Sequence, residues 1–127
     1  MMEMKDAAFL CRFATDKSLI LIDELGRATS NEDGIAIAWA VSEHLIARGS
    51  MTFFVSHYPQ MNELGEIYPV VQNQHMAASL PNNSESEDLS YLHKIMPGAC
   101  GASSDYGIEM SRSCGWPEEV VAMVGYI

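Results

Sequence analysis

Hydrophobic and polar positions in the first half of the chain follow two patterns, one typical of helices and one typical of extended strands. They predict four elements in order: a helix over residues 2–14, a strand over 18–23, a helix over 31–47 and a strand over 51–56. The first helix has a stripe of apolar or small residues at helical spacing: Met4, Ala7, Ala8 and Cys11. The order strand, helix, strand defines a βαβ unit, for which a right-handed parallel crossover is the default.

The two central elements have clear local signals. The uninterrupted apolar run 19–22 is typical of a strand buried on both faces of a parallel sheet. Ser30 is the expected N-cap of the following helix, with Asp33 three positions on as its capping partner. The first half of that helix is apolar nearly all round, which predicts packing between the sheet and its neighbours. Gly49 is the expected stop.

The second half of the chain predicts shorter elements. A short helix is expected at 59–65. Strands over 70–80 and 89–96 are expected to form an antiparallel hairpin around a polar acidic turn at 81–88. A helix at 105–113 and a last helix that begins at Pro117 follow. Two acids in the first turn of the last helix favour its dipole. Its apolar side is expected to need a partner that the chain does not contain: Val120, Val121, Val124 and Ile127.

Composition narrows the class of protein. The 127 residues are 48% hydrophobic, enough for the core of one small domain. Seventeen acidic against 7 basic residues give a net charge of −10, which argues against this segment gripping nucleic acid by itself. Cys11, Cys100 and Cys114 lack metal-binding spacing and are interpreted as reduced thiols. We find no signal peptide and no apolar run of transmembrane length, so the expected compartment is cytosol or nucleus.

Two adjacent carboxylates, Asp23 and Glu24, are the first candidates for chemistry. They follow the first strand, and ligands of α/β folds bind at the carboxyl ends of strands. Mg²⁺ prefers oxygen ligands and keeps several waters, so one carboxylate plus phosphates suffices to hold it. A carboxylate one residue on can orient the water that attacks a γ-phosphate. The alternative is a buried strand followed by a solvated acidic turn.

A polar loop and a histidine accompany the acids. The loop Gly26–Ser30 is rich in hydrogen-bonding groups and could contact a neighbouring nucleotide or subunit; the alternative is a plain turn and helix cap. His57 follows the second strand, and adjacent parallel strands end side by side, so it should face the same crevice as Asp23 and Glu24. A neutral imidazole there can hydrogen-bond a γ-phosphate or its water. The other histidines lack this placement and are interpreted as surface or packing residues: His44, His75 and His93.

The stretch SLILIDELGRATSNEDG at 18–34, followed by FFVSHY at 53–58, resembles the C-terminal ATPase domain of the MutS family of DNA mismatch-recognition proteins. By this resemblance, Asp23 and Glu24 match the Walker B pair, Gly26–Ser30 matches the loop across the dimer interface, and His57 matches the switch histidine. Two further segments are similar to family motifs: Met1–Met4 to the end of the signature segment, and Ser104–Ile108 to the segment before the helices that pair subunits.

The resemblance implies an α/β fold, namely a partial P-loop (ABC-type) ATPase domain with parallel strands, flanking helices, a C-terminal antiparallel hairpin and further helices. Residues 1–117 would be the C-terminal part of that domain, and 104–127 the start of a helical dimerisation segment. In such composite ATPases two subunits sandwich two nucleotides. The implied cofactors are ATP and Mg²⁺, and the implied partners are a second MutS-family subunit and double-stranded DNA, bound through domains absent here. No membrane partner is implied.

The resemblance also assigns roles to single residues. Asp23 would hold the metal, Glu24 and His57 would be catalytic, and the nucleotide would contact a further set of residues: Asp23, Gly26, Thr29 and Ser30. Ala28 stands where many members carry glycine, which makes the loop look more like the meiotic branch, MutS homologue four, than the repair branch. That branch implies a nuclear protein acting on recombination junctions.

The sequence departs from the family pattern in one central respect. It has no G-x-x-x-x-G-K-S/T motif, so the loop that cradles phosphates is missing. We therefore expect a fragment of a longer protein that neither binds ATP tightly nor hydrolyses it alone. Two alternatives stay open: a catalytically dead MutS-like module that only dimerises, and another ABC-type ATPase of chromosome maintenance or double-strand-break repair.

Overall fold

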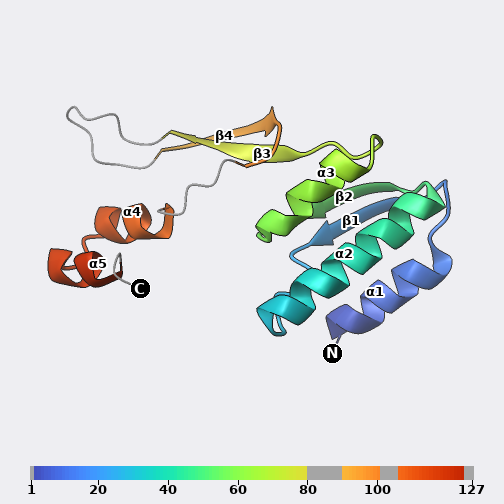
Figure 1. Cartoon of the computed structure of the whole chain (residues 1–127), viewed down its shortest axis with the longest axis horizontal. Helices are drawn as coiled ribbons and strands as arrows, with labels where there is room; N and C mark the ends of the chain where they lie inside the picture. The colour runs from blue at the N-terminus through green and yellow to red at the C-terminus, as the bar shows by residue number, and fades with distance from the viewer. Residues whose placement is uncertain (1, 80–89, 101–105, 125–127) are drawn as a thin grey trace. The chain divides into compact units, whose positions relative to one another are not determined.

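The computed structural model describes residues 2–79, 90–100 and 106–124 (Figure 1). The chain divides into two compact units, Met1–Val71 and Gln72–Ile127. The first unit contains six elements: α1 (Met2–Phe13), β1 (Leu19–Asp23), α2 (Asn31–Arg48), β2 (Met51–Val55), the 3₁₀ helix η1 (Pro59–Glu63) and α3 (Leu64–Ile67). The predicted order of helix, strand, helix and strand is confirmed. The predicted helix at 59–65 is instead a 3₁₀ turn that runs into a single α-helical turn.

The strands β1 and β2 pair in parallel, as the βαβ pattern predicts. Their register aligns Leu19 with Met51 and Asp23 with Val55, so both strands end at the same edge. The connecting helix α2 begins where expected, because the Ser30 hydroxyl oxygen accepts a hydrogen bond from the Asp33 N–H at 3.2 Å. It ends at Gly49, whose backbone is left-handed with φ of 70°.

The core of the first unit lies on one face of this strand pair. Helices α1 and α2 lie side by side (Figure 1), and both contribute side chains to one buried cluster with β1. Its members are Ala7, Ala14, Ile20, Ile22, Leu25, Val41 and Leu45. Of the stripe predicted on α1, Ala7 is buried and Met4 and Cys11 pack against the cluster, but Ala8 is exposed. His44 has a packing role, since its Nε2 lies 2.8 Å from the carbonyl oxygen of Cys11 and ties α2 to α1.

The prediction that the first strand is buried on both faces is wrong for this chain. The side chains of β1 alternate between exposed and buried, and Leu21 is 74% exposed beside Ile22 at 8%. Phe53, its register partner on β2, is 53% exposed. The physical reason is that the described helices of this unit cover a single face, and the strand pair has no second layer among the described residues of the same unit.

The second unit contains a hairpin and two helices, each described by itself. Its elements are β3 (Gln74–Ser79), β4 (Ser90–Pro97), α4 (Tyr106–Ser113) and α5 (Glu118–Val124). The strands β3 and β4 are antiparallel, as predicted. β3 begins at Gln74 rather than residue 70, because Pro69 and Val70 form a turn closed by a hydrogen bond from the Val71 N–H to the Tyr68 carbonyl at 2.9 Å. The predicted acidic turn at 81–88 lies outside the described residues.

The last helix differs in part from the prediction of a wholly unpartnered apolar side. Pro117 precedes it and accepts hydrogen bonds from Val120 and Val121 through its carbonyl oxygen. Val121 is buried, at 2% exposure, whereas Val120 is 40% exposed. Ile127 lies outside the described residues, so this part of the prediction stays open.

Two further findings concern the cysteines and the length and apolar character of the described helices. Cys11, Cys100 and Cys114 are free thiols. None of the helices within the described ranges combines the length and the apolar character that crossing a bilayer requires. The predicted boundaries, 1–117 for the ATPase part and 104–127 for the helical segment, come from the family resemblance and stay predictions.

Candidate functional site

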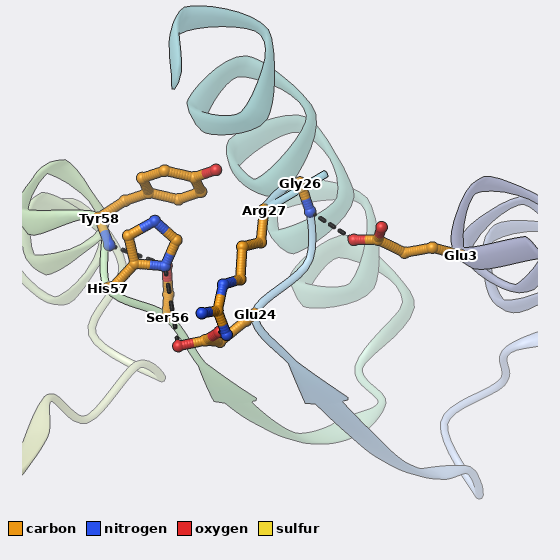
Figure 2. Close-up of polar contacts among 7 residues, drawn as sticks. All are labelled: Glu3, Glu24, Gly26, Arg27, Ser56, His57 and Tyr58. Carbon is orange, nitrogen blue, oxygen red and sulfur yellow. Dashed lines mark hydrogen bonds and ion pairs between the residues drawn. The ribbon is translucent and has the colours of Figure 1, made fainter. Parts of the chain in front are cut away.

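The common edge of β1 and β2 brings the predicted acids and histidine together. The Glu24 N–H donates to the Val55 carbonyl at 2.9 Å, which extends the strand pairing by one residue. The next residues of the two strands therefore leave the sheet side by side. Figure 2 shows the result: His57 Nδ1 lies 3.9 Å from Glu24 Oε1. The expected proximity of Glu24 and His57 is confirmed, while their chemical roles stay predictions.

Glu24 occupies a conformation that few residues with a Cβ adopt. Its φ is +50°, in the left-handed region, where the chain leaves β1 and turns into the loop. The turn is closed by a hydrogen bond from the Arg27 N–H to the Glu24 carbonyl at 3.2 Å. Arg27 also pairs with the Glu24 carboxylate, Nη1 to Oε2 at 2.5 Å. With side-chain exposures of 74% for Arg27 and 33% for Glu24, this is a surface pair that stabilises the fold by at most about 1 kcal/mol.

Asp23 lies at the end of β1 with its side chain exposed. It borders an open hollow on the surface together with four other residues: Glu3, Glu24, Arg27 and Ala28. Within the described ranges, no group of three or more His, Cys, Asp or Glu side chains is arranged to hold a metal ion. A protein-only metal cage is therefore not what this edge offers. An accessible carboxylate such as Asp23 fits Mg²⁺, which takes one or two protein oxygens and completes its shell with water and phosphate.

The loop Gly26–Ser30 is anchored at one end and exposed at the other. Gly26 is buried with φ of +93°, and its N–H donates to Glu3 Oε1 at 2.7 Å (Figure 2). Thr29 and Ser30 are exposed. The Ser30 hydroxyl also donates to Asp33 Oδ2 at 2.8 Å, so Ser30 has a capping role whatever else it contacts. The turn-and-cap interpretation thus holds for Ser30, and Thr29 is left with its side chain facing outward.

Three residues of this region lie in the stretches that carry the family resemblance but were given no individual role in the sequence-based prediction: Glu3, Gly34 and Tyr58. Glu3 reaches the loop from α1, 23 positions away in sequence. A Cβ added at Gly34 would lie 2.2 Å from the Tyr58 hydroxyl oxygen and 2.7 Å from the Gly26 carbonyl oxygen, so only glycine fits. Tyr58 is 5% exposed, and its ring centroid lies 4.2 Å from that of His57. The sequence signal for Gly34 is a glycine inside the first turn of a helix, which indicates a close approach, whereas Glu3 and Tyr58 leave no such signal.

The geometry defines the class first: a mixed α/β segment that contains an antiparallel hairpin in one unit and, in the other, a parallel strand pair with an acid pair and a histidine at one edge. Residues 1–126 match the profile of MutS domain V. The chain therefore belongs to the MutS family. The family resemblance inferred from the Asp23–Glu24 and His57 motifs is confirmed at this level.

Individual relatives agree with the family match. The chain is 38% identical over 121 residues to the DNA mismatch repair protein MutS of Thermotoga petrophila, covering 95% of this chain and 14% of that protein. It is 43% identical over 122 residues to the proteins of the same name from Prochlorococcus marinus (95% and 12%) and Thermus aquaticus (96% and 14%). The chain thus spans about one seventh of the length of these relatives, which are bacterial. They do not bear on the predicted meiotic branch.

Proposed function

We propose that this chain is the part of a MutS-family ATPase that carries the Walker B acids, the dimer-interface loop and the switch histidine. The whole protein would bind mismatched DNA or recombination junctions under control of ATP. The observation that carries the proposal is the contact of Glu24 with His57, beside Asp23, at the ends of two parallel strands in a chain of MutS domain V.

In this proposal Mg·ATP, when bound, would supply the phosphoryl group that water attacks. Asp23, Glu24 and His57 would bind the metal and orient the reactants. Asp23 is the protein ligand of Mg²⁺, since its carboxylate is accessible at the strand end. Glu24 orients the attacking water, because the backbone turn and Arg27 fix its carboxylate while leaving it partly exposed. His57, whose Nδ1 lies 3.9 Å from Glu24 Oε1, would hydrogen-bond the same water or the γ-phosphate.

The loop supplies contacts across a dimer. Thr29 and Ser30 are exposed and would meet the nucleotide held by a second MutS-family subunit, whereas Gly26, the third predicted contact, is buried with its N–H bonded to Glu3 and would instead hold the loop in place. The P-loop (ABC-type) fold and the dimer belong to the proposal, and this sequence itself contains no phosphate-cradling motif. The net charge of −10 supports DNA contact through other domains. The proposed setting is the nucleus, and the proposed role is mismatch repair or, in view of Ala28 in the loop, meiotic recombination.

The test is a chimera in which this chain replaces the matching segment of the Thermus aquaticus relative. The chimera is expected to hydrolyse ATP, and Glu24→Gln to lower the rate by about 100-fold or more while ATP binding persists. Glu63→Gln, at an exposed acid away from the edge, is the control and should leave the rate unchanged. A folded chimera that dimerises without hydrolysing ATP would support the alternative, a dead interaction module. The isolated 127-residue chain is expected to show no turnover.

A further inference from the structure

Tyr58 joins an exposed side chain to the interior of the first unit. The His57 side chain is 47% exposed, whereas Tyr58, the next residue, is 5% exposed. Their rings lie 4.2 Å apart between centroids and are tilted by 44° (Figure 2). The Tyr58 N–H donates to Ser56 Oγ at 3.1 Å, which fixes the backbone on the other side of His57. A displacement of the imidazole ring therefore meets a ring that has little room to move.

The far end of the Tyr58 side chain lies against the first turn of α2. A Cβ at Gly34 would lie 2.2 Å from the Tyr58 hydroxyl oxygen and 3.0 Å from Cζ, so the hydroxyl occupies the space of a missing side chain. Gly34 in turn lies against the loop. A Cβ at Gly26 would be 2.7 Å from the Gly34 Cα atom. His57, Tyr58, Gly34 and Gly26 thus form a continuous series of close contacts.

The loop has a second anchor on its opposite side. Glu3 Oε1 accepts the Gly26 N–H at 2.7 Å, a charge-assisted hydrogen bond that holds the glycine toward α1. Gly26 is therefore held between Glu3 and Gly34. With one side fixed by Glu3, the position of Gly34 sets where the exposed residues that follow, up to Ser30, are presented.

We propose that Tyr58 is a positioning residue that couples His57 to the loop Gly26–Ser30 through Gly34. This inference rests on the proposed function, in which His57 would contact the γ-phosphate or the attacking water and the loop would meet the nucleotide held by the second subunit. Tyr58 itself would contact neither the nucleotide nor the second subunit. It transmits the position of the imidazole to the start of α2, and from there to the loop.

The experiment is a double-mutant cycle on the 127-residue chain, read from the amide NMR signals of Gly26, Thr29 and Gly34. His57→Gln is introduced into the wild type and into Tyr58→Phe, which keeps the ring beside residue 57 but removes the hydroxyl that fills the space at Gly34. Tyr68→Phe is the matched control, because it removes another part-buried tyrosine hydroxyl of the same unit, far along the chain from the loop. Tyr58→Leu is the second variant, in case Tyr58→Phe does not fold.

His57→Gln is expected to displace each of the three amide signals by the same amount in the wild type as in Tyr68→Phe. In Tyr58→Phe or Tyr58→Leu the displacement should fall by about two-fold or more. Equal displacement in all backgrounds would overturn the proposal and assign the coupling to the Glu24–Arg27 pair, which also joins His57 to the loop. No nucleotide is present, so this result is independent of whether the proposed ATPase activity holds.

Discussion

The two faces of the β1–β2 pair have nearly the same chemistry and opposite surroundings. Ile20 and Ile22 are 3% and 8% exposed under α1 and α2, whereas Leu19 and Leu21, which alternate with them along β1, are 65% and 74% exposed. The strand sequence shows no alternation, but its burial does. The comparison teaches that an apolar strand sequence shows only which side chains could be buried. The elements that pack on each face decide how much those side chains contribute to stability.

The largest expected effect is a difference in the free energy of unfolding between substitutions at two adjacent residues of β1. Ile22→Ala should lower the free energy of unfolding by about 2–5 kcal/mol, because it opens a cavity beneath the helices. Leu21→Ala, one position earlier on the open face, should change it by no more than about 0.5 kcal/mol. Urea denaturation of both variants measures the difference. Similar losses for the two would mean that the open face is covered in solution.

The covered side also depends on how closely the loop approaches α2. Gly34→Ala should destabilise the first unit by about 1–3 kcal/mol, because the new methyl would overlap the Tyr58 hydroxyl and the Gly26 carbonyl. Gly107→Ala in α4 is the control, since a Cβ there meets no atom within 4 Å. That change should be neutral or stabilising by up to about 1 kcal/mol. A tolerated alanine at position 34 would contradict the packing described.

The helix that covers the sheet is fixed at its start by a single side chain. Ser30→Ala removes the acceptor for the Asp33 N–H and should cost about 1 kcal/mol of unfolding free energy. Ser30→Asn restores an acceptor and should recover most of that loss. Thermal denaturation of the three proteins gives the comparison. If alanine and asparagine behaved alike, the cap would not be what holds the start of α2.

The smallest effect concerns the end of α3, tied to α2 by a hydrogen bond from the Tyr68 hydroxyl to Glu43 Oε1 at 2.7 Å. This bond, followed by partial burial and the charge of Glu43, raises the pKa of Tyr68 above its ordinary value of 10.0. The stabilisation is therefore complete below the ordinary value and is lost as pH rises through the raised one. Between about pH 8 and about pH 12 the wild type should lose more stability than Tyr68→Phe. Parallel stability curves for the two would exclude this contribution.

Local and register-based features of this chain could be predicted from sequence. The Ser30 cap involves residues three apart, and the αL stop at Gly49 involves a single residue. The meeting of Glu24 and His57 followed from one rule, that adjacent parallel strands end together. These predictions needed no knowledge of how the helices pack.

Features set by tertiary packing could not be predicted in the same way. The Glu3–Gly26 hydrogen bond spans 23 positions, and the approach of Tyr58 to Gly34 depends on a ring filling the space of an absent Cβ. Neither leaves a periodic pattern. The burial of β1 on both faces was predicted wrongly, because hydrophobicity reveals nothing about which layers a given stretch of chain provides. The nucleotide-binding roles of Asp23, Gly26, Thr29 and Ser30 stay predictions.

The left-handed backbone at Glu24 has an evolutionary consequence. A residue with a Cβ loses about 1 kcal/mol in that conformation, and glycine or asparagine would lose less. Mutation under selection for folding alone would therefore replace the glutamate. Gly26 and Gly34 are protected in the opposite sense, since any side chain there would collide with neighbouring backbone. If Glu24 has the proposed role, a lineage that no longer needed its carboxylate should lose the acid at position 24 long before it lost either glycine.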